Sequence, residues 1–186
     1  MARNQMGKET RARILAATRA LLGEVGLEGT TLKAIGDRAG VRAGSFYNLF
    51  ASKDEAVLEV VREAIRAVDP HPAGEGVDTV EELVGAYVDF VTGDPIVARI
   101  YLQIAVGGGL TDEEMGRRVL GHHQRRIERF ADAILRADPG LTSDEARRRA
   151  EATVATLNGL AFHWLLDRSL DFAGQAARLV AEHAAR

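Results

Sequence analysis

The chain has 186 residues, with 24 Lys and Arg against 27 Asp and Glu, which gives a net charge of −3. It contains no cysteine, so disulfides and thiolate metal sites are excluded. The first residues lack the apolar run of a signal peptide, and no apolar stretch reaches the ~18–20 residues that span a bilayer. We therefore expect a cytoplasmic protein without a membrane partner.

The net charge hides an uneven distribution along the chain. Residues 1–53 carry nine basic and four acidic side chains, or +5, whereas the other 133 residues carry −8. A basic N-terminal part beside an acidic remainder fits binding to a phosphate backbone. A charge of +5 over this length also falls within ordinary surface variation, so the pattern has meaning only together with a DNA-binding motif.

The first expected helix runs from about Lys8 to Val25, with an apolar stripe at helical spacing, and Gly26 ends it. The second expected helix begins after Thr30-Thr31 and buries three positions at helical spacing, which are Leu32, Ile35 and Ala39. Gly40 then supplies the positive φ that a tight helix exit needs.

A third short helix follows, with Phe46 and Phe50 sharing one face. Its other face carries small or hydrogen-bonding groups and no acid, namely Ala43, Gly44, Ser45, Tyr47 and Asn48. A helix presented in this way fits the major groove, with its first turn against the base edges. The three segments together predict a helix-turn-helix that binds double-stranded DNA.

A capping box from Ser52 to Glu55 starts the fourth expected helix, which covers residues 53–68. The segment from Asp69 to Gly76 contains two prolines and two glycines and cannot continue a helix. We therefore expect a helix-turn-helix DNA-binding domain over residues 1–53, a connecting helix over 53–68, and a second domain over 69–186.

Every later segment opens with a helix signal. The signals are Asp78 with Glu81, Asp94 before Pro95, Thr111 with Glu114, Thr142 with Glu145, and Asp171. No strand-like alternation of any length is present. The sequence predicts an all-α protein of about nine helices, with an N-terminal three-helix helix-turn-helix domain and a C-terminal helical domain.

The helix that begins at Thr142 has no formally charged residue between Ala152 and Leu166. Apolar residues lie most of the way round it, so it must be covered on several sides. One interpretation is a homodimer, in which this helix and the one after Asp171 pack against their symmetry mates as a four-helix interface. The alternative is a buried central helix in a monomer.

The segment from about Lys8 to Leu58 resembles the DNA-binding domain of the TetR family of bacterial transcriptional regulators. The matching residues are Ile14 to Ala17, Gly26, Thr30, Thr31, Ile35, Ala39 to Val41, Gly44 to Tyr47, Phe50, and Ser52 to Glu55. The resemblance covers roughly the first third of the chain, and the remainder is similar only in length and helical character. It implies a dimeric repressor that binds a palindromic operator, and a C-terminal domain for ligand binding and dimerisation. A small, mostly apolar effector would then release the protein from the operator.

The resemblance also implies which residues contact DNA. Thr31, Tyr47 and Lys53 would contact phosphates, and the groove would be faced by Arg42, Ala43, Gly44, Ser45 and Asn48. Similar proteins usually have a small hydroxyl residue at the position of Arg42, so the helix cap is lost here, at a cost of ~1 kcal/mol. We hypothesise that Arg42 reaches a guanine edge or a phosphate instead; the alternative is a solvated side chain. Leu49 stands where a polar aromatic or imidazole is common, so one phosphate contact is missing.

In proteins of this kind the effector pocket lies among the fourth to eighth helices. The candidate pocket residues are Tyr87, Phe90, Tyr101, Gln103, Phe130, Asn158, Phe162, His163 and Trp164. Each aromatic residue is equally compatible with the core, and His163 with a core or interface position. Asn158 and Gln103 are more informative, because an amide on a mostly apolar helix needs hydrogen-bond partners.

Other motifs do not indicate catalysis. The adjacent His122 and His123 point about 100° apart on a helix and do not readily ligate one ion, and Gly107 to Gly109 lacks the lysine of a phosphate loop. We therefore expect no enzyme activity, cofactor or metal. Two alternatives stay open: a DNA-binding dimer whose C-terminal domain has no small-molecule ligand and serves dimerisation or a protein partner, and an all-α enzyme or binding protein with an incidental helix-turn-helix.

Overall fold

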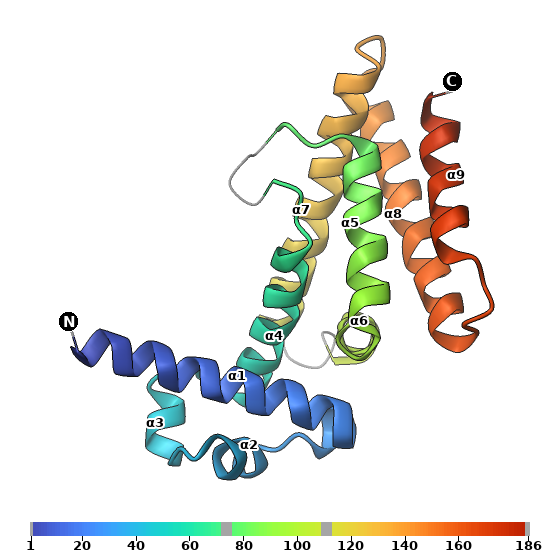
Figure 1. The fold of residues 1–186 in the computed structure, drawn as a ribbon. Helices are drawn as coiled ribbons and strands as arrows, with labels where there is room; N and C mark the ends of the chain where they lie inside the picture. Colours follow the sequence, from blue (N-terminus) through green and yellow to red (C-terminus); the bar gives the residue numbers. More distant parts are fainter. Residues whose placement is uncertain (1, 72–75, 109–112, 185–186) are drawn as a thin grey trace. The chain divides into compact units, whose positions relative to one another are not determined.

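The computed structural model describes residues 2–71, 76–108 and 113–184 (Figure 1). These residues form nine α-helices and one π-helical turn, and none of them lies in a strand. The predicted all-α fold with about nine helices is therefore confirmed. The chain packs as two compact units, one of Met1–Ala64 with Ile96–Tyr101 and the other of Ile65–Pro95 with Leu102–Arg186. The division into functional domains at residues 53 and 69 stays a prediction.

The first unit contains α1 (Ala2–Gly29), α2 (Leu32–Ala39), α3 (Ala43–Tyr47) and most of α4 (Lys53–Ala67). α1 begins at Ala2, earlier than the expected Lys8, and a last helical turn continues to Gly29. Gly26 nevertheless breaks the helix as predicted, because its φ of 70° and ψ of −173° are not helical. The core of this unit consists of apolar side chains from all four helices, including Ile14, Leu22, Ile35, Phe46, Phe50, Val57 and Val60.

Short-range hydrogen bonds set the ends of α2 and the start of α4. The Thr31 side chain accepts the Ala34 N–H at 3.1 Å, and Gly40 ends α2 with a φ of 63°. At α4 the Ser52 hydroxyl accepts the Glu55 N–H at 3.1 Å, while the Glu55 carboxylate accepts from Ala51. The predicted Ser52 cap is therefore present, and Glu55 reaches back to the Ala51 N–H, one residue before the amide that a standard capping box uses.

In the second unit α5 (Val80–Gly93), α7 (Glu113–Ala137), α8 (Ser143–Leu166) and α9 (Phe172–Ala184) lie side by side (Figure 1). Buried side chains from all four helices form its core, including Phe90, Val91, Phe130, Val154, Leu157, Phe172 and Ala176. α6 (Pro95–Gln103) starts at the predicted proline, and the chain continues as a π-helical turn over Ile104–Gly108 instead of the expected α-helix to about Val106. The predicted start of the seventh helix at Thr111 lies outside the described residues.

The cap of α5 differs from the prediction. Thr79, and not Asp78, is the N-cap, and it forms a capping box with Glu82. The predicted capping box of Thr142 with Glu145 is confirmed, as is Asp171 at α9, whose carboxylate accepts the Gly174 N–H at 3.0 Å. Asp78 is not available as a cap because its carboxylate is buried against α7.

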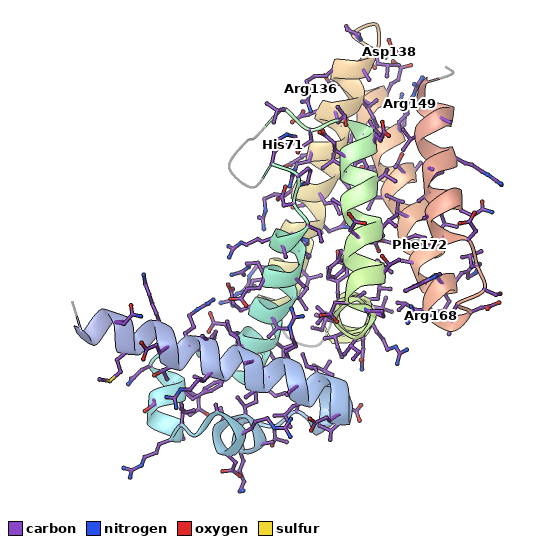
Figure 2. All side chains as sticks on the ribbon, viewed as in Figure 1. His71, Arg136, Asp138, Arg149, Arg168 and Phe172 are labelled. Atoms are coloured by element: carbon purple, nitrogen blue, oxygen red, sulfur yellow. The ribbon has the colours of Figure 1, made fainter. Side chains whose placement is uncertain are left out.

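Asp78 belongs to a polar network that joins the α4–α5 connection to α7. Its side chain is 2% exposed and accepts from the Arg129 Nε at 3.0 Å. Arg129 also donates to both carboxylate oxygens of Asp69, at 2.9 and 3.0 Å, and thereby lowers the Asp69 pKa. His71 Nδ1 lies 3.1 Å from Asp78, and Arg136 donates to the Asp78 carbonyl oxygen. Figure 2 shows His71 and Arg136 near the start of α5.

Candidate functional site

α3 presents its polar residues to solvent, while Phe46 faces the core of the first unit. Phe50 was expected on the same helix, but α3 ends at Tyr47, so Phe50 packs against Phe46 from three residues beyond the helix end. Phe46 and Phe50 are 1% and 4% exposed, and their ring centroids lie 5.6 Å apart. Every groove-facing residue of the prediction is exposed: Arg42, Ala43, Gly44, Ser45 and Asn48. Tyr47 is 58% exposed, with its ring edge-on to Phe46. The two phenylalanines therefore position a short, open helix that is small enough for the major groove.

The two other predicted phosphate contacts lie at helix starts. The Thr31 hydroxyl oxygen accepts the Ala34 N–H at 3.1 Å, which leaves the hydroxyl proton to donate to a phosphate. Lys53, the first residue of α4, is half-buried and donates from Nζ to the Leu27 carbonyl oxygen at 3.2 Å. That bond uses one of the three ammonium donors and holds the cation near the end of α1.

Arg42 occupies the N-cap position of α3, and its side chain makes no capping hydrogen bond. Replacing Arg42 with serine is therefore expected to stabilise the first unit by about 1 kcal/mol, because a hydroxyl can accept an orphan N–H of α3. Urea unfolding followed by circular dichroism measures this change. Arg42→Ala is the matched control, since it removes the cation without adding a cap; equal stabilities of the two variants would contradict the cap explanation.

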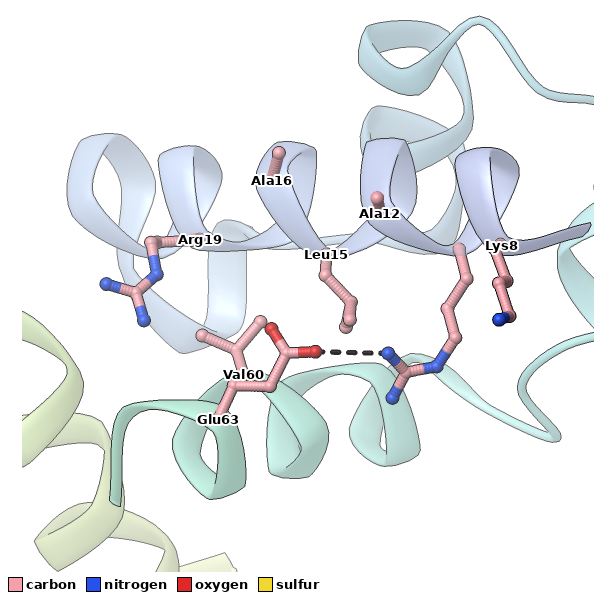
Figure 3. A pocket seen from close by; sticks show the side chains of 8 residues that line it. Lys8, Ala12, Leu15, Ala16, Arg19, Val60 and Glu63 are labelled. Carbon is pink, nitrogen blue, oxygen red and sulfur yellow. Dashed lines mark hydrogen bonds and ion pairs between the residues drawn. The ribbon is translucent and has the colours of Figure 1, made fainter. Parts of the chain in front are cut away.

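One pocket of the first unit is a groove between α1 and α4 (Figure 3). It has a volume of about 480 Å³ and is lined by Lys8, Arg11, Ala12, Leu15, Ala16, Arg19, Val60 and Glu63. Arg11 crosses it, 2.7 Å from Glu59 and 3.0 Å from Glu63. None of the predicted pocket residues lines this groove, and its paired charges join α1 to α4.

Four of the predicted pocket residues gather in the second unit. Tyr87 donates from its hydroxyl to the Asn158 Oδ1 at 2.9 Å, and its ring lies 6.3 Å from that of Phe90. Phe130 on α7 is connected to this group through Arg126. Tyr87, Phe90 and Phe130 are each less than 9% exposed, so their rings also belong to the core.

The remaining predicted pocket residues lie apart from that group. Phe162 is 55% exposed, and His163 and Gln103 are also exposed. Trp164 is half-buried and its ring is tilted against that of Phe172, with a centroid distance of 6.1 Å. Tyr101 is half-buried in α6 and belongs to the first unit.

Arg126 on α7 is a residue that the sequence reasoning missed. Its guanidinium carbon lies 4.0 Å from the Tyr87 ring centroid and 6.0 Å from that of Phe130, and its Nη1 donates to the Asn158 Oδ1 at 3.0 Å. A sequence signal was available, because Arg126 precedes Phe130 by one helical turn and therefore shares the apolar face of α7. A cation on such a face needs a specific partner.

Two other features of the described residues bear on function. They contain no group of three or more His, Asp or Glu side chains that could hold a metal ion. His122 and His123 are both half-buried in α7. Within the same residues, no helix combines the length and the apolar character needed to cross a membrane.

Comparison with known proteins agrees with this geometry. Residues 14–60 match the family model of bacterial regulatory proteins of the tetR family. The N-terminal domain belongs to the TetR family. The match begins in α1 and ends in α4, so it contains the whole helix-turn-helix. The resemblance seen in the sequence is thereby confirmed.

Relatives of this TetR-family domain are found among curated proteins and solved structures. The HTH-type transcriptional repressor KstR2 of Mycobacterium tuberculosis is 44% identical over 52 residues, which are 28% of this chain and 26% of KstR2. The aligned part thus spans about a quarter of that relative.

Two solved structures are similar over nearly the whole chain. A transcriptional regulator from Aquifex aeolicus VF5 has a TM-score of 0.68 at 22% identity, covering 93% of this chain and 96% of that one. SmeT, the repressor of the Stenotrophomonas maltophilia multidrug efflux pump SmeDEF, has a TM-score of 0.67 at 22% identity, covering 95% and 91%. At this identity the two structures establish the fold of both units.

Proposed function

We propose that this protein is a dimeric transcriptional repressor that binds a palindromic operator and releases it when a small, mostly apolar effector binds the helical body. The observation that carries the DNA-binding part is the exposed face of α3, held by the buried Phe46 and Phe50. Tyr47, Thr31 and Lys53 are the phosphate contacts of the proposal, and Arg42, Ala43, Gly44, Ser45 and Asn48 are its groove-facing residues. KstR2, a repressor by its description, is similar over this domain.

Dimerisation is supported by an uncovered stripe on α8. Ala152, Ala155, Gly159, Phe162 and Leu166 are all exposed and alternate by three and four residues, the spacing of a helix–helix seam. Leu166 is 71% exposed and Phe162 is 55% exposed, which is unfavourable for an isolated chain. Two such surfaces would cover each other across a two-fold axis, together with the small residues Ala173 and Ala177 of α9.

Two DNA-binding domains are needed because one short recognition helix contacts few base edges. In a symmetric dimer the two α3 helices would lie ~34 Å apart, or a small multiple of that distance, and would contact the two halves of a palindrome. An effector that changes the relative position of the two domains would move the helices out of register with the grooves. The second candidate function is a DNA-binding dimer without an effector. It differs from the first only in that no small molecule releases it from the operator.

The Tyr47→Ala and Lys53→Ala variants test the DNA-binding proposal. Each is expected to weaken binding about ten- to a hundredfold on all sequences alike, because a hydrogen bond to a charged phosphate contributes roughly 1.5–3 kcal/mol. Lys53→Ala should also reduce the slope of log K against the logarithm of salt concentration by about one, because one phosphate contact is lost. The measurement is a fluorescence anisotropy titration of duplexes from the DNA flanking the gene, at two salt concentrations.

Arg62→Ala is the matched control for Lys53→Ala, because Arg62 lies further along α4, is exposed and pairs with Glu59 at 2.5 Å. It should leave affinity and salt dependence unchanged. Unchanged affinity in both test variants would remove these phosphate contacts and the DNA-binding proposal with them.

The Phe162→Glu variant tests the dimer. It is expected to weaken dimerisation at least about a hundredfold, because the change buries an unpaired carboxylate in a two-fold interface. The isolated chain should keep its fold, since Phe162 is 55% exposed in it. Sedimentation velocity over a range of concentrations measures the dissociation constant. Gln124→Glu is the control, because it adds the same charge at an exposed position of α7. A Phe162→Glu dimer as stable as that of the wild type would show that the interface lies elsewhere.

A further inference from the structure

Arg126 and Arg129 lie one helical turn apart on α7 and differ in their partners. Arg129 is bound by two carboxylates, Asp69 and Asp78, at 2.9–3.0 Å. Among the described residues, Arg126 has a neutral acceptor, the Asn158 Oδ1 at 3.0 Å, and the faces of the Tyr87 and Phe130 rings at 4.0 and 6.0 Å. Its second terminal nitrogen, Nη2, is buried and has no hydrogen-bond partner among the described residues.

An orphan N–H on a cation is unfavourable inside a protein. Buried polar groups are almost always hydrogen-bonded, and a buried charge is normally paired with an opposite charge. A cation–π contact compensates for part of the lost hydration, but it leaves the in-plane N–H donors of the guanidinium unused. Arg126 therefore lacks one anionic acceptor in the described part of the chain.

We infer that Arg126 is the anchor for a carboxylate carried by the effector, and that the effector is a small apolar acid. This inference rests on the proposed effector-responsive function and specifies its ligand class. The guanidinium plane is fixed by Tyr87 below it and by Asn158 at one edge, which leaves the Nη2 edge as the donor for the incoming acid. Planar carboxylate oxygens match such an edge in geometry and charge.

The surroundings of Arg126 favour an apolar frame for that acid. Tyr87 and Phe130 flank the guanidinium and are 8% and 2% exposed, and Phe172 lies next to Tyr87 with a centroid distance of 6.5 Å. Asn158 Oδ1 already accepts two hydrogen bonds, from Tyr87 and Arg126. Its role is therefore to hold the two donors, and the charge recognition is left to Arg126.

The same contacts couple binding to the arrangement of the helices. Tyr87 belongs to α5, Arg126 to α7 and Asn158 to α8, so one hydrogen-bonded group joins three helices of the second unit. Because the Nη2 is shielded from water, an acid reaches it only when the side chains around it rearrange. An acid that hydrogen-bonds to Arg126 would thus bind the rearranged packing more tightly than the packing seen here. A ligand needs such a difference in affinity to shift the equilibrium between two conformations.

The test uses matched probes and the full chain. Thermal shifts are measured with hexanoate, decanoate, phenylacetate and 4-phenylbutanoate, each beside its primary amide, and with inorganic phosphate as a simple anion. For the wild type we expect at least one acid to raise the Tm while its amide and phosphate do not. No acid with a larger shift than its amide, or phosphate as effective as the acids, would overturn the inference.

Variants separate charge recognition from a structural role. Arg126→Met should abolish the preference for acids, Arg126→Lys should keep part of it, and Arg125→Met, at the adjacent exposed arginine, should leave it intact. Without ligand, Arg126→Met should be at least as stable as the wild type, since a half-buried cation whose Nη2 is buried without an acceptor is replaced by an apolar chain. A large loss of unliganded stability, or a preference for acids that survives in Arg126→Met, would instead make Arg126 a structural residue.

DNA binding is measured separately so that the two proposals can fail independently. Anisotropy with operator DNA, with and without the acid that binds most tightly, reports release. Acid binding without release would uphold the Arg126 site and overturn the effector-controlled repressor. Operator binding without any preference for acids would overturn the Arg126 site and uphold the DNA-binding part of the proposed function.

Discussion

Replacing Phe46 with alanine is expected to destabilise the first unit by about 3–5 kcal/mol, the usual cost of removing a buried phenylalanine ring. Phe46 is 1% exposed, and its ring packs on Phe50 with a centroid distance of 5.6 Å. α3 has five residues, too few to persist without tertiary contacts. The loss of this ring should therefore release the recognition helix and abolish operator binding at temperatures where the second unit stays folded.

Tyr47→Ala is the matched comparison, because Tyr47 is the next residue and is 58% exposed. It should weaken DNA binding while changing the free energy of unfolding by less than about 1 kcal/mol, as is usual for surface positions. Urea unfolding and anisotropy on both variants give the two quantities. A Phe46→Ala variant as stable as Tyr47→Ala would show that the core of this domain does not depend on the α3 aromatic face.

The second large effect is expected for Asp78→Asn. Asp78 is 2% exposed, accepts a hydrogen bond from the Arg129 Nε and forms an ion pair with the same guanidinium, and the variant loses the charge that balances it. Breaking a buried pair from one side costs about 3–5 kcal/mol. Since Arg129 is 38% exposed and keeps its bonds to Asp69, we expect a loss of roughly 2–3 kcal/mol in unfolding free energy, reduced by solvent screening.

A double-mutant cycle with Arg129→Met distinguishes the ion pair from unrelated damage. If the two residues act through each other, the double variant should be more stable than the sum of the single losses predicts, by about 1–3 kcal/mol. Glu81→Gln is the control for removing a carboxylate near the same helix start, because Glu81 is exposed, and it should change stability by less than about 0.5 kcal/mol. Strict additivity of Asp78→Asn and Arg129→Met would contradict the network.

The N-cap of α5 was predicted at the wrong residue, because two overlapping capping patterns are present in the sequence. Asp78 with Glu81 and Thr79 with Glu82 both fit a capping box, and the structure uses the second. The choice is made by Arg129, 51 residues later in the chain, which takes the Asp78 carboxylate into the interior. A local pattern contains no information about that distant partner.

The candidate pocket residues illustrate the same limit. Tyr87 and Phe162 are both aromatic residues at helical spacing in apolar stretches, yet one is 8% exposed and the other 55%. The sequence places Arg126 one turn before Phe130 on the apolar face of α7, but it does not show which groups meet the guanidinium there. Its unusual environment exists only where Tyr87 and Asn158 meet it.

The sequence alone determined the all-α class, the breaks at Gly26 and Gly40, the side-chain cap at Ser52, the capping box at Thr142 and the helix-turn-helix itself. These features depend on backbone conformation and hydrogen bonds between residues at most a few positions apart, and the residue types specify them directly. Only the tertiary structure decided which carboxylate is buried, which aromatic side chains stay exposed on α8, and which arginine of α7 lacks an acceptor. Those outcomes depend on the packing of helices that are distant in the chain, where each side chain's free energy is set by partners that its own neighbours in sequence do not reveal.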